Sequence, residues 1–482
     1  MTLEIQPTIK KPNLELELSS DDIRHMAQQA VEHIVAHLEN VAQMPAMSNE
    51  GGVELSHRLK ESMPEQGTRI EAILEEFFND IVPCSFNTAG PGHMAYIPGG
   101  GIIHSAIGDL IANAVNRYVG IWLGAPGMVQ LETNVIRWFC DIMGLPKDAL
   151  GILTTGGSMA NFSAIIAARK EKLPENFLKG TIYVSDQVHH SITKSAILAG
   201  FPEANVRAMP SDELGRIKLN DLEAGIDSDN QAGFQPFMVV GSAGTTNTGA
   251  VDDFQGLAKT AQEKNLWFHV DGAYGAFFML TETGQKVMVG IEQSDSITLD
   301  PHKGLFLPYG TGALLVRDRE TLRRSHSSHA EYLPDMQEDP DFVDYCELSP
   351  ELTRDYRGFR IWLPIKLHGI QPFRDNLQEK IELTHWVTEE LRKLENIEII
   401  SEPQLTVMAF RLKLPDMDAE ALNQLNQDLL DRVLAKKNVI LSGTMFHGIY
   451  VIRFCILSFR THLDRVQQAL EDINISIAEL TD

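Results

Sequence analysis

The stretch Ser296-Ile-Thr-Leu-Asp-Pro-His-Lys-Gly-Leu-Phe306 sets a lysine, Lys303, just beyond a short apolar segment. Ile297 and Leu299 predict a buried strand, which Asp300-Pro301 brings to an end. Burial disfavours an ammonium group and lowers its pKa, so a lysine at this place can act as a nucleophile toward carbonyl compounds. Taken alone, such a lysine is more often a surface residue after a turn. The residues upstream therefore decide its interpretation.

The composition is that of a globular protein that does not bind nucleic acid. The chain has 482 residues, 43% of them hydrophobic, and a formal net charge of −25. This length predicts two or three domains, and the negative charge argues against nucleic acid or an anionic membrane as a partner. Apolar runs stay below the roughly 18 residues of a membrane span, and the N-terminal residues lack a signal core. Four scattered cysteines without metal-ligand spacing predict reduced thiols, a cytoplasmic location and no metal site.

From Gly151 onward, strand, loop and helix alternate. This rhythm predicts a mainly parallel sheet covered by helices, in which ligands bind beyond the carboxyl ends of the strands. After about residue 375 the pattern becomes that of a small α+β domain, and an amphipathic helix beginning at Ser20 precedes the sheet. The strands of the sheet are expected at residues 152–154, 181–184, 236–240, 266–270, 296–299 and 313–316.

Polar residues follow several of these strands. Thr154 to Asn161 joins a strand to a helix through two glycines, which suits either a phosphate cradle or a plain tight turn. His189 or His190 follows the next strand, where a single histidine is more often structural. Asp271 ends an apolar strand and needs a cationic partner, for which a protonated ring nitrogen would serve. A cradle, an aspartate and a lysine thus occur in order at successive strand ends.

Five segments together resemble the group II pyridoxal phosphate (PLP)-dependent amino-acid decarboxylases, which include aromatic-L-amino-acid, glutamate and diaminobutyrate decarboxylases. The resemblance implies PLP as cofactor, an amino acid as substrate, and a homodimer of PLP fold type I. It also implies an N-terminal, dimer-contacting helical segment at residues 1–100, a large PLP-binding α/β domain at 101–375 and a small C-terminal α+β domain at 376–482. The matching segments are Thr155–Ser163, Ser185–Ser191, Gly244–Asp252, His269–Gly275 and Asp300–Gly304.

The same resemblance assigns roles to individual residues. Lys303 matches the lysine that forms a Schiff base with PLP, and Asp271 matches the partner of the pyridine nitrogen. His189 matches the histidine stacked on the ring, and Tyr332 matches a mobile-loop tyrosine that protonates the product carbanion. Further cofactor contacts are implied for Gly157, Ser158, Thr246, Ala273 and His302.

The substrate pocket departs from the pattern of the aromatic enzymes. Asp300 replaces a common asparagine close to where the phosphate is expected, and Gly120 and Ile97 replace aromatic residues. Arg117 either faces the pocket, which favours an acidic substrate, or pairs with a helix acid such as Asp109. Substrate contacts are predicted for Tyr96, Pro98, Tyr118 and Trp122, some of them from the neighbouring subunit.

The sequence therefore predicts an L-amino-acid α-decarboxylase that releases CO2 and an amine, with aromatic amino acids as possible substrates. Three alternatives stay open. One is a decarboxylase of glutamate, aspartate or 2,4-diaminobutyrate, and another is an aldehyde-forming, oxygen-using decarboxylase, against which Tyr332 argues. The third is a non-catalytic relative that serves as an interaction protein, against which the retained Lys303 and Asp271 argue.

Overall fold

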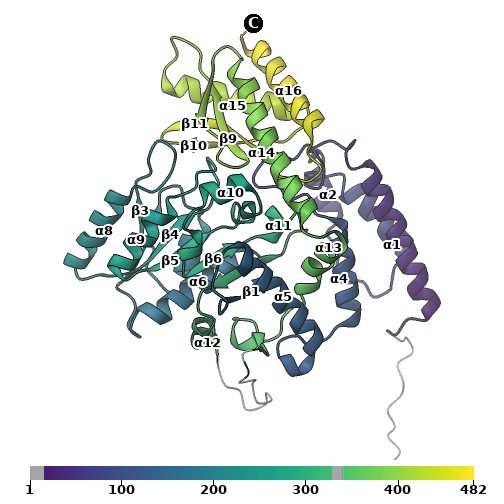
Figure 1. Ribbon diagram of the computed structural model, residues 1–482. Helices are drawn as coiled ribbons and strands as arrows, with labels where there is room; N and C mark the ends of the chain where they lie inside the picture. The colour runs from purple at the N-terminus through teal and green to yellow at the C-terminus, as the bar shows by residue number, and fades with distance from the viewer. Residues whose placement is uncertain (1–15, 328–338, 340, 482) are drawn as a thin grey trace, which may run out of the picture. The chain divides into compact units, whose positions relative to one another are not determined.

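The computed structural model describes residues 16–327, 339 and 341–481 and divides the chain into two compact units, Met1–Asn87 and Thr88–Asp482 (Figure 1). The described residues of the first unit form three α-helices and a π-helical segment, Phe77–Ile81, and the hydroxyl of Ser19 caps the first α-helix by accepting from the amide of Asp22. That helix buries none of its residues, so its apolar stripe is exposed. The helices are α1 (Ser20–Asn40), α2 (Gly52–Arg58) and α3 (Ile70–Glu76).

A seven-stranded, mainly parallel sheet forms the centre of the second unit. Its strand order is β1-β7-β6-β5-β4-β2-β3, and only β7 runs antiparallel to its two neighbours. The interior strands are buried along nearly their whole length, which explains their continuous apolar sequences. The strands are β1 (Leu150–Thr154), β2 (Gly180–Ser185), β3 (Val206–Met209), β4 (Gln235–Ser242), β5 (Trp267–Asp271), β6 (Ser296–Leu299) and β7 (Gly312–Val316).

Helices cover both faces of this sheet (Figure 1). In β4, Val239 packs into the apolar cluster that includes α8 and α9, whereas Met238 and Val240 pack into the cluster that includes α6 and α7. The helices of this region are α4 (Ile103–Val115), α5 (Pro126–Ile142), α6 (Gly157–Lys172), α7 (Ser191–Leu198), α8 (Leu219–Gln231), α9 (Phe254–Lys264), α10 (Glu282–Val287), α11 (Pro301–Gly304), α12 (Glu320–His326) and α13 (Gly358–His368).

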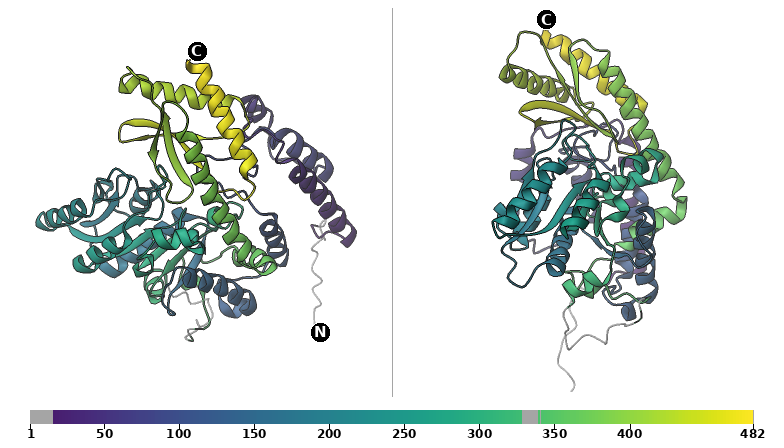
Figure 2. Two further views of the ribbon diagram at one scale, coloured as in Figure 1. Left: turned by 45° about the horizontal axis from the view of Figure 1, so that its top comes forward. Right: turned by 60° about the vertical axis from the view of Figure 1, so that its left-hand side comes forward.

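A smaller antiparallel sheet of order β10-β11-β9-β8 forms the C-terminal part. Helices α14, α15 and α16 pack on one of its faces around a shared apolar core that includes Phe410 and Phe454 (Figure 2). The other face includes Cys455, which belongs to the core of the large sheet. The elements are α14 (Gln371–Arg392), β8 (Ile397–Ser401), β9 (Val407–Leu412), α15 (Ala419–Ala435), β10 (Ser442–Phe446), β11 (Ile449–Cys455) and α16 (Leu463–Thr481).

Some elements of the structure were not predicted from the sequence. The apolar residues Val439–Leu441 are typical of a strand, but β10 begins at Ser442, because Ile440 instead bridges to His93 beside the sheet. Helix α13 was not predicted either, because Pro364 in its interior weakens its helical pattern. Among the helices that the structure describes, none combines the length and apolar content needed to cross a membrane.

Candidate active site

The carboxyl ends of five strands meet around one pocket of about 290 Å³. Each of these strands contributes side chains from its last residue or from the loop that follows, as expected for a parallel sheet. Ile97, from the loop before α4, also lines the pocket. The predicted site residues found in its lining are Gly157, Ser158, His189, Thr246, Asp271, Ala273, His302 and Lys303.

Lys303 lies on the short helix α11, directly after β6. Its Nζ is 3.0 Å from Oδ2 of Asp300, so the two side chains form an ion pair inside the pocket. The Asp300 side chain is almost fully buried, and its Oδ1 has no hydrogen-bond partner among the described residues. His302 donates from Nδ1 to the carbonyl of Thr311 at 2.7 Å, which holds its ring against this pair. The structure thus places a primary amine and a buried carboxylate side by side.

The turn between β1 and α6 forms the anion-binding end of the pocket. The Thr154 hydroxyl bonds to both the amide and the carbonyl of Gly156 and so closes the turn. The first amides of α6, at Gly157 and Ser158, have no carbonyl one turn back and can bind an anion, which the helix dipole also favours. A Cβ at Gly157 would lie 3.0 Å from Asp300 Oδ2 and 3.1 Å from Ala273 Cβ. A side chain at this position would therefore force Asp300 or Ala273 to shift by a few tenths of an ångström.

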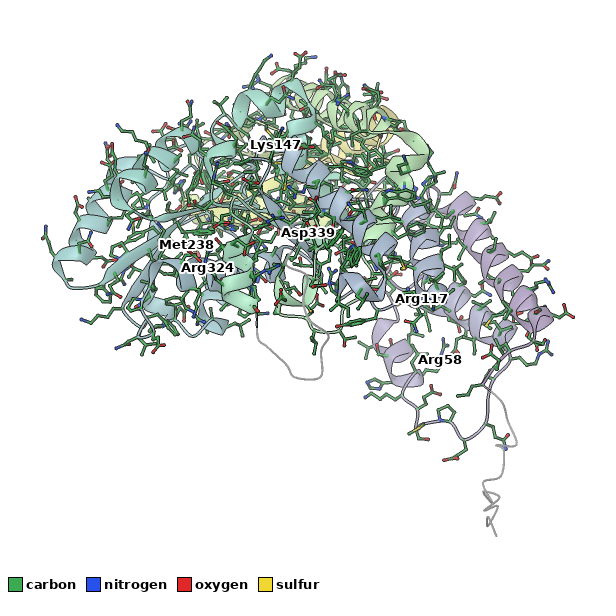
Figure 3. The ribbon with its side chains drawn as sticks, turned by 60° about the horizontal axis from the view of Figure 1, so that its bottom comes forward. Arg58, Arg117, Lys147, Met238, Arg324 and Asp339 are labelled. Carbon is green, nitrogen blue, oxygen red and sulfur yellow. The ribbon has the colours of Figure 1, made fainter. Side chains whose placement is uncertain are left out.

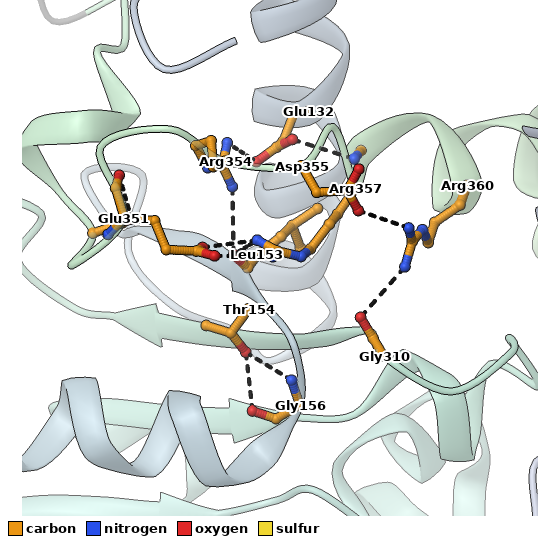
Figure 4. A network of polar contacts seen from close by, with 12 residues as sticks. Glu132, Leu153, Thr154, Gly156, Gly310, Glu351, Arg354, Asp355, Arg357 and Arg360 are labelled. Atoms are coloured by element: carbon orange, nitrogen blue, oxygen red, sulfur yellow. Dashed lines mark hydrogen bonds and ion pairs between the residues drawn. The ribbon is translucent and has the colours of Figure 1, made fainter. Parts of the chain in front are cut away.

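Two buried arginines brace this turn from behind (Figure 4). Arg354 and Arg357 both donate to the carbonyl of Leu153, the residue before Thr154. Arg354 forms a fully buried ion pair with Glu132 of α5 at 2.6 Å, and Arg357 forms a two-point pair with Glu351. The segment that follows residue 341 is thereby tied to the end of β1.

Asp271 lies at the opposite end of the pocket. Its Oδ1 accepts from the amide of Ala273 at 3.2 Å, and its Oδ2 accepts from Nδ2 of Asn161 at 3.1 Å. The carboxylate is 8% exposed. These donors stabilise a negative charge that faces the pocket.

His189 lines the pocket between these two ends. Its Nδ1 lies 2.8 Å from the Ser191 hydroxyl. Burial lowers the pKa of its imidazole, as do the nearby Lys303 and His190, while Asp271 and Asp300 act in the opposite direction. The net effect favours a neutral ring near pH 7. Such a ring can stack on a flat aromatic ligand.

The four predicted substrate contacts do not line this pocket. Tyr96 is 58% exposed and adopts a positive φ of 54°, while the neighbouring Ile97 faces the pocket instead. The Tyr118 hydroxyl donates to the carbonyl of Leu352, and Trp122 stacks on Phe342. Pro98 is buried beside Ile97 but is likewise not part of the lining, and Tyr332 lies outside the described residues.

Arg117 does not pair with Asp109. It is exposed and donates to the carbonyl of Val115 at 2.8 Å (Figure 3). Asp109 instead forms an ion pair with Arg360 at 2.6 Å. The lining of the pocket does not include Arg117, so its position gives no support to recognition of an acidic side chain.

The lining of the pocket includes residues to which the sequence assigned no role, among them Asn161, Ser191 and Tyr274. Asn161 ends the glycine-rich motif, and its position one helical turn after Gly157 is the signal that could have found it. Ser191 follows the histidine pair directly. Tyr274 follows Asp271 and fills the space over Gly244, where a Cβ would lie 2.4 Å from its ring.

This arrangement suits one kind of ligand. An anion cradle stands at one end, a carboxylate at the other and a primary amine between them, which fits a phosphorylated heteroaromatic aldehyde. The described residues offer no group of three or more His, Cys, Asp or Glu side chains that could hold a metal ion. Fold and pocket together define a class: enzymes of fold type I that use PLP.

Comparison with known proteins narrows this class. The family model described as "Pyridoxal-dependent decarboxylase conserved domain" matches residues 53–413. The aromatic-L-amino-acid decarboxylase of Bacillus atrophaeus is 31% identical over 97% of this chain and 98% of its own. The phenylacetaldehyde synthase of Petunia hybrida is 28% identical over 93% of each chain.

A solved structure agrees with these relatives. The tryptophan decarboxylase of Catharanthus roseus in complex with L-tryptophan superimposes with a TM-score of 0.90, at 27% identity over 96% of this chain and 99% of that one. The chain belongs to the pyridoxal-dependent decarboxylase family and is a PLP-dependent amino-acid decarboxylase. Its large mainly parallel sheet and small C-terminal domain confirm the predicted fold.

Proposed function

We propose that the protein removes the α-carboxyl group of an aromatic L-amino acid as CO2 and releases the corresponding amine. The observation that carries this proposal is the convergence of Lys303, Asp271 and the Gly157 turn on one pocket, in a chain whose relatives are named for aromatic substrates. When bound, PLP supplies an electron sink for the pair left by the broken carbon–carbon bond.

The residues that line the pocket have the following proposed roles. The Lys303 amine would attach the cofactor and give way to the substrate amine. Asp271 would hold a proton at the ring nitrogen, and the neutral His189 ring would lie against the ring. The Gly157 amide and the Ser158 hydroxyl would bind the phosphate, beside His302. Thr246 and Ala273 would complete the walls around the ring.

The substrate class can be tested by measuring CO2 and amine release from the twenty standard amino acids and 2,4-diaminobutyrate. We expect the highest kcat/KM among the aromatic amino acids. An aromatic relative bound to L-tryptophan supports this expectation. The highest kcat/KM on an acidic or diamino substrate would contradict it.

An aldehyde product is the second candidate, because one relative is named as a phenylacetaldehyde synthase. We assign the return of a proton to Cα to Tyr332, which favours the amine. Tyr332→Phe should still release CO2 but should form much less amine, with aldehyde, ammonia and peroxide appearing when oxygen is present. Tyr450→Phe, a change within β11, serves as the control. Unchanged amine formation by Tyr332→Phe would refute the assignment.

We also propose that the enzyme is a cytoplasmic homodimer, with residues 1–100 contacting the partner and a division of the remainder near residue 375. Four unpaired cysteine thiols support the location. A row of exposed apolar side chains on α4, among them Ile107, Leu110 and Val115, supports the dimer. We expect an interface above roughly 2,000 Å², as in obligate dimers. Tyr96, Pro98, Tyr118 and Trp122 then contact the substrate in the assembled dimer.

Sedimentation tests this assembly. Leu110→Asp should shift the protein toward a folded monomer, because the charge would be buried in the contact. Leu214→Asp alters a similarly exposed leucine in the turn before α8 and should remain dimeric. An active monomer in the unaltered protein would refute the dimer.

A further inference from the structure

Asn161 joins two functional groups of the pocket. It lies in α6 with 1% of its surface exposed. Its Nδ2 donates to Asp271 Oδ2 at 3.1 Å and to the Ser191 hydroxyl oxygen at 3.1 Å. Its Oδ1 accepts from the Thr298 hydroxyl at 2.7 Å. The reverse orientation of the amide would direct its oxygen at the carboxylate of Asp271, so the contacts fix which atom donates.

The direction of donation continues from Asn161 to His189. The backbone amide of Ser191 donates to His189 Nδ1 at 3.2 Å, so this nitrogen acts as an acceptor. The Ser191 hydroxyl accepts from Asn161 and therefore directs its own hydrogen to the same Nδ1, at 2.8 Å. A neutral His189 then carries its proton on Nε2, on the opposite side of the ring.

A second branch holds Asn161 in place. Because Asn161 Oδ1 is an acceptor, His269 Nε2, at 3.0 Å, must be the donor. The Nδ1 of His269 is then an acceptor for the Ser296 hydroxyl at 2.8 Å, and the Ser296 oxygen accepts from the indole of Trp267. Full burial lowers the pKa of His269 to about 4, so the ring is neutral, as this pattern requires.

We propose that Asn161 is a positioning residue that orients the Asp271 carboxylate and, through Ser191, keeps the proton of His189 on Nε2. The proposal rests on the function proposed above for Asp271 and His189, and it adds a residue that couples the two. One side chain thus contacts the carboxylate at one end of the pocket directly and the imidazole at its middle through Ser191. Asn161 achieves both because an amide donates two hydrogens from a single nitrogen.

Two variants separate the two branches. Ser191→Ala removes the hydroxyl that donates to His189 Nδ1 and leaves the bond between Asn161 and Asp271. Asn161→Ala removes the bonds that Nδ2 donates to Ser191 and to Asp271 but leaves the Ser191 hydroxyl in place. Thr298→Val is the matched control, because it takes away a donor to Asn161 Oδ1 but neither bond made by Nδ2.

The readout is the ionisation of His189 in the cofactor-free, full-length protein, followed by NMR with labelled histidine and assigned with His189→Gln. In the unaltered protein we expect an unprotonated Nδ1 and a pKa below the ordinary value of about 6.5. In Ser191→Ala the pKa should rise toward that value, since the hydroxyl donor that opposes protonation of Nδ1 is gone. In Asn161→Ala it should rise as well, because the Ser191 oxygen no longer accepts from Asn161 and can turn to accept from a protonated Nδ1. Lys303, His190, Asp271 and Asp300 also face this ring and remain in every protein compared.

The outcomes are distinct. A His189 proton on Nδ1 in the unaltered protein, or the same His189 pKa in all variants, would overturn the proposal. An equal rise in Thr298→Val would also overturn it, because the effect would then be general loosening. Turnover at saturating PLP should fall in Asn161→Ala well below that of Ser191→Ala, since only the former affects Asp271. If the NMR result holds but no variant binds PLP, the proposed function fails and the positioning role stands.

Discussion

At the scale of single residues, the ion pair between Asp300 and Lys303 is the feature that most needs explanation. The carboxylate lies 3.0 Å from the amine that we propose to react and close to the Gly157 turn, where an anion is expected to bind. It therefore holds the amine in an ion pair and opposes the approach of a phosphate. Both effects should make cofactor uptake weaker than the pocket would otherwise allow.

Asp300→Asn should therefore raise the affinity of the cofactor-free protein for PLP, by about tenfold for each 1.4 kcal/mol of repulsion removed. Pyridoxal, which lacks the phosphate, reports the effect on Lys303 alone. Absorbance titrations should show a larger gain for PLP than for pyridoxal. A lower affinity for PLP in this variant would mean that Asp300 contributes a favourable contact.

A site residue could be predicted from the sequence when it directly follows a strand. Asp271 and Lys303 directly follow apolar strands, so the parallel sheet itself brings them together. The role of Asn161 could not be foreseen, because its four partners come from three other elements, α7, β5 and β6, and meet only in the fold. Tyr96 and Trp122 were expected in the pocket. Within one chain, however, Trp122 stacks on Phe342 and Tyr96 is exposed.

At the scale of elements, the end of β1 depends on the ion pair between Arg354 and Glu132. Both side chains are buried, at 0% and 1% exposure, and Arg354 also lies over the ring of Tyr345. Removing one partner leaves an uncompensated charge in the interior, which typically costs about 3–5 kcal/mol. The turn that forms the anion cradle follows this strand directly.

Arg354→Met should thus lower the free energy of unfolding by about 3–5 kcal/mol and weaken PLP binding, as measured by urea denaturation and absorbance titration. The double change Glu132→Gln with Arg354→Met should recover most of the stability, because no charge is left unpaired. Arg24→Met, which breaks an exposed pair with Asp21, should cost less than about 1 kcal/mol. Equal losses in the single and double variants would refute this account of the pair.

The predicted and observed elements differ where tertiary contacts override the local pattern. The interior strands of the large sheet were predictable from their apolar sequences, whereas β3 at its edge is only partly buried and carries no such signal. Val439 to Leu441 resembles a strand in sequence, yet β10 starts at Ser442, because Ile440 pairs instead with the segment around His93.

For the whole molecule, buried histidines set the response to acid. Neither ring nitrogen of His93 has a hydrogen-bond partner among the described residues, and burial lowers its pKa to about 4. Burial lowers the pKa of His269 similarly. The unfolded chain, with a histidine pKa of about 6.5, binds more protons than the folded one between these values. Stability from these residues is present above pH 6.5 and is lost as the pH falls toward 4.

His93→Leu should reduce this loss, because leucine fills an apolar site without a group that must stay neutral. Urea denaturation at several pH values should show that the free energy of unfolding of the variant rises relative to that of the unaltered protein as the pH falls from 6.5 to 4. Near pH 7.5 the two should differ little. A constant difference across this range would show that His93 does not titrate with unfolding.

The central claim is that Lys303 attaches PLP in this chain. Its most direct test is to load the purified protein with PLP, reduce it with borohydride and locate the pyridoxyl group by peptide mass spectrometry. We expect one modified site, Lys303, and no modification of that peptide in Lys303→Ala. This variant should also lose nearly all CO2 release. A pyridoxyl group on a different lysine, or full turnover in Lys303→Ala, would contradict it.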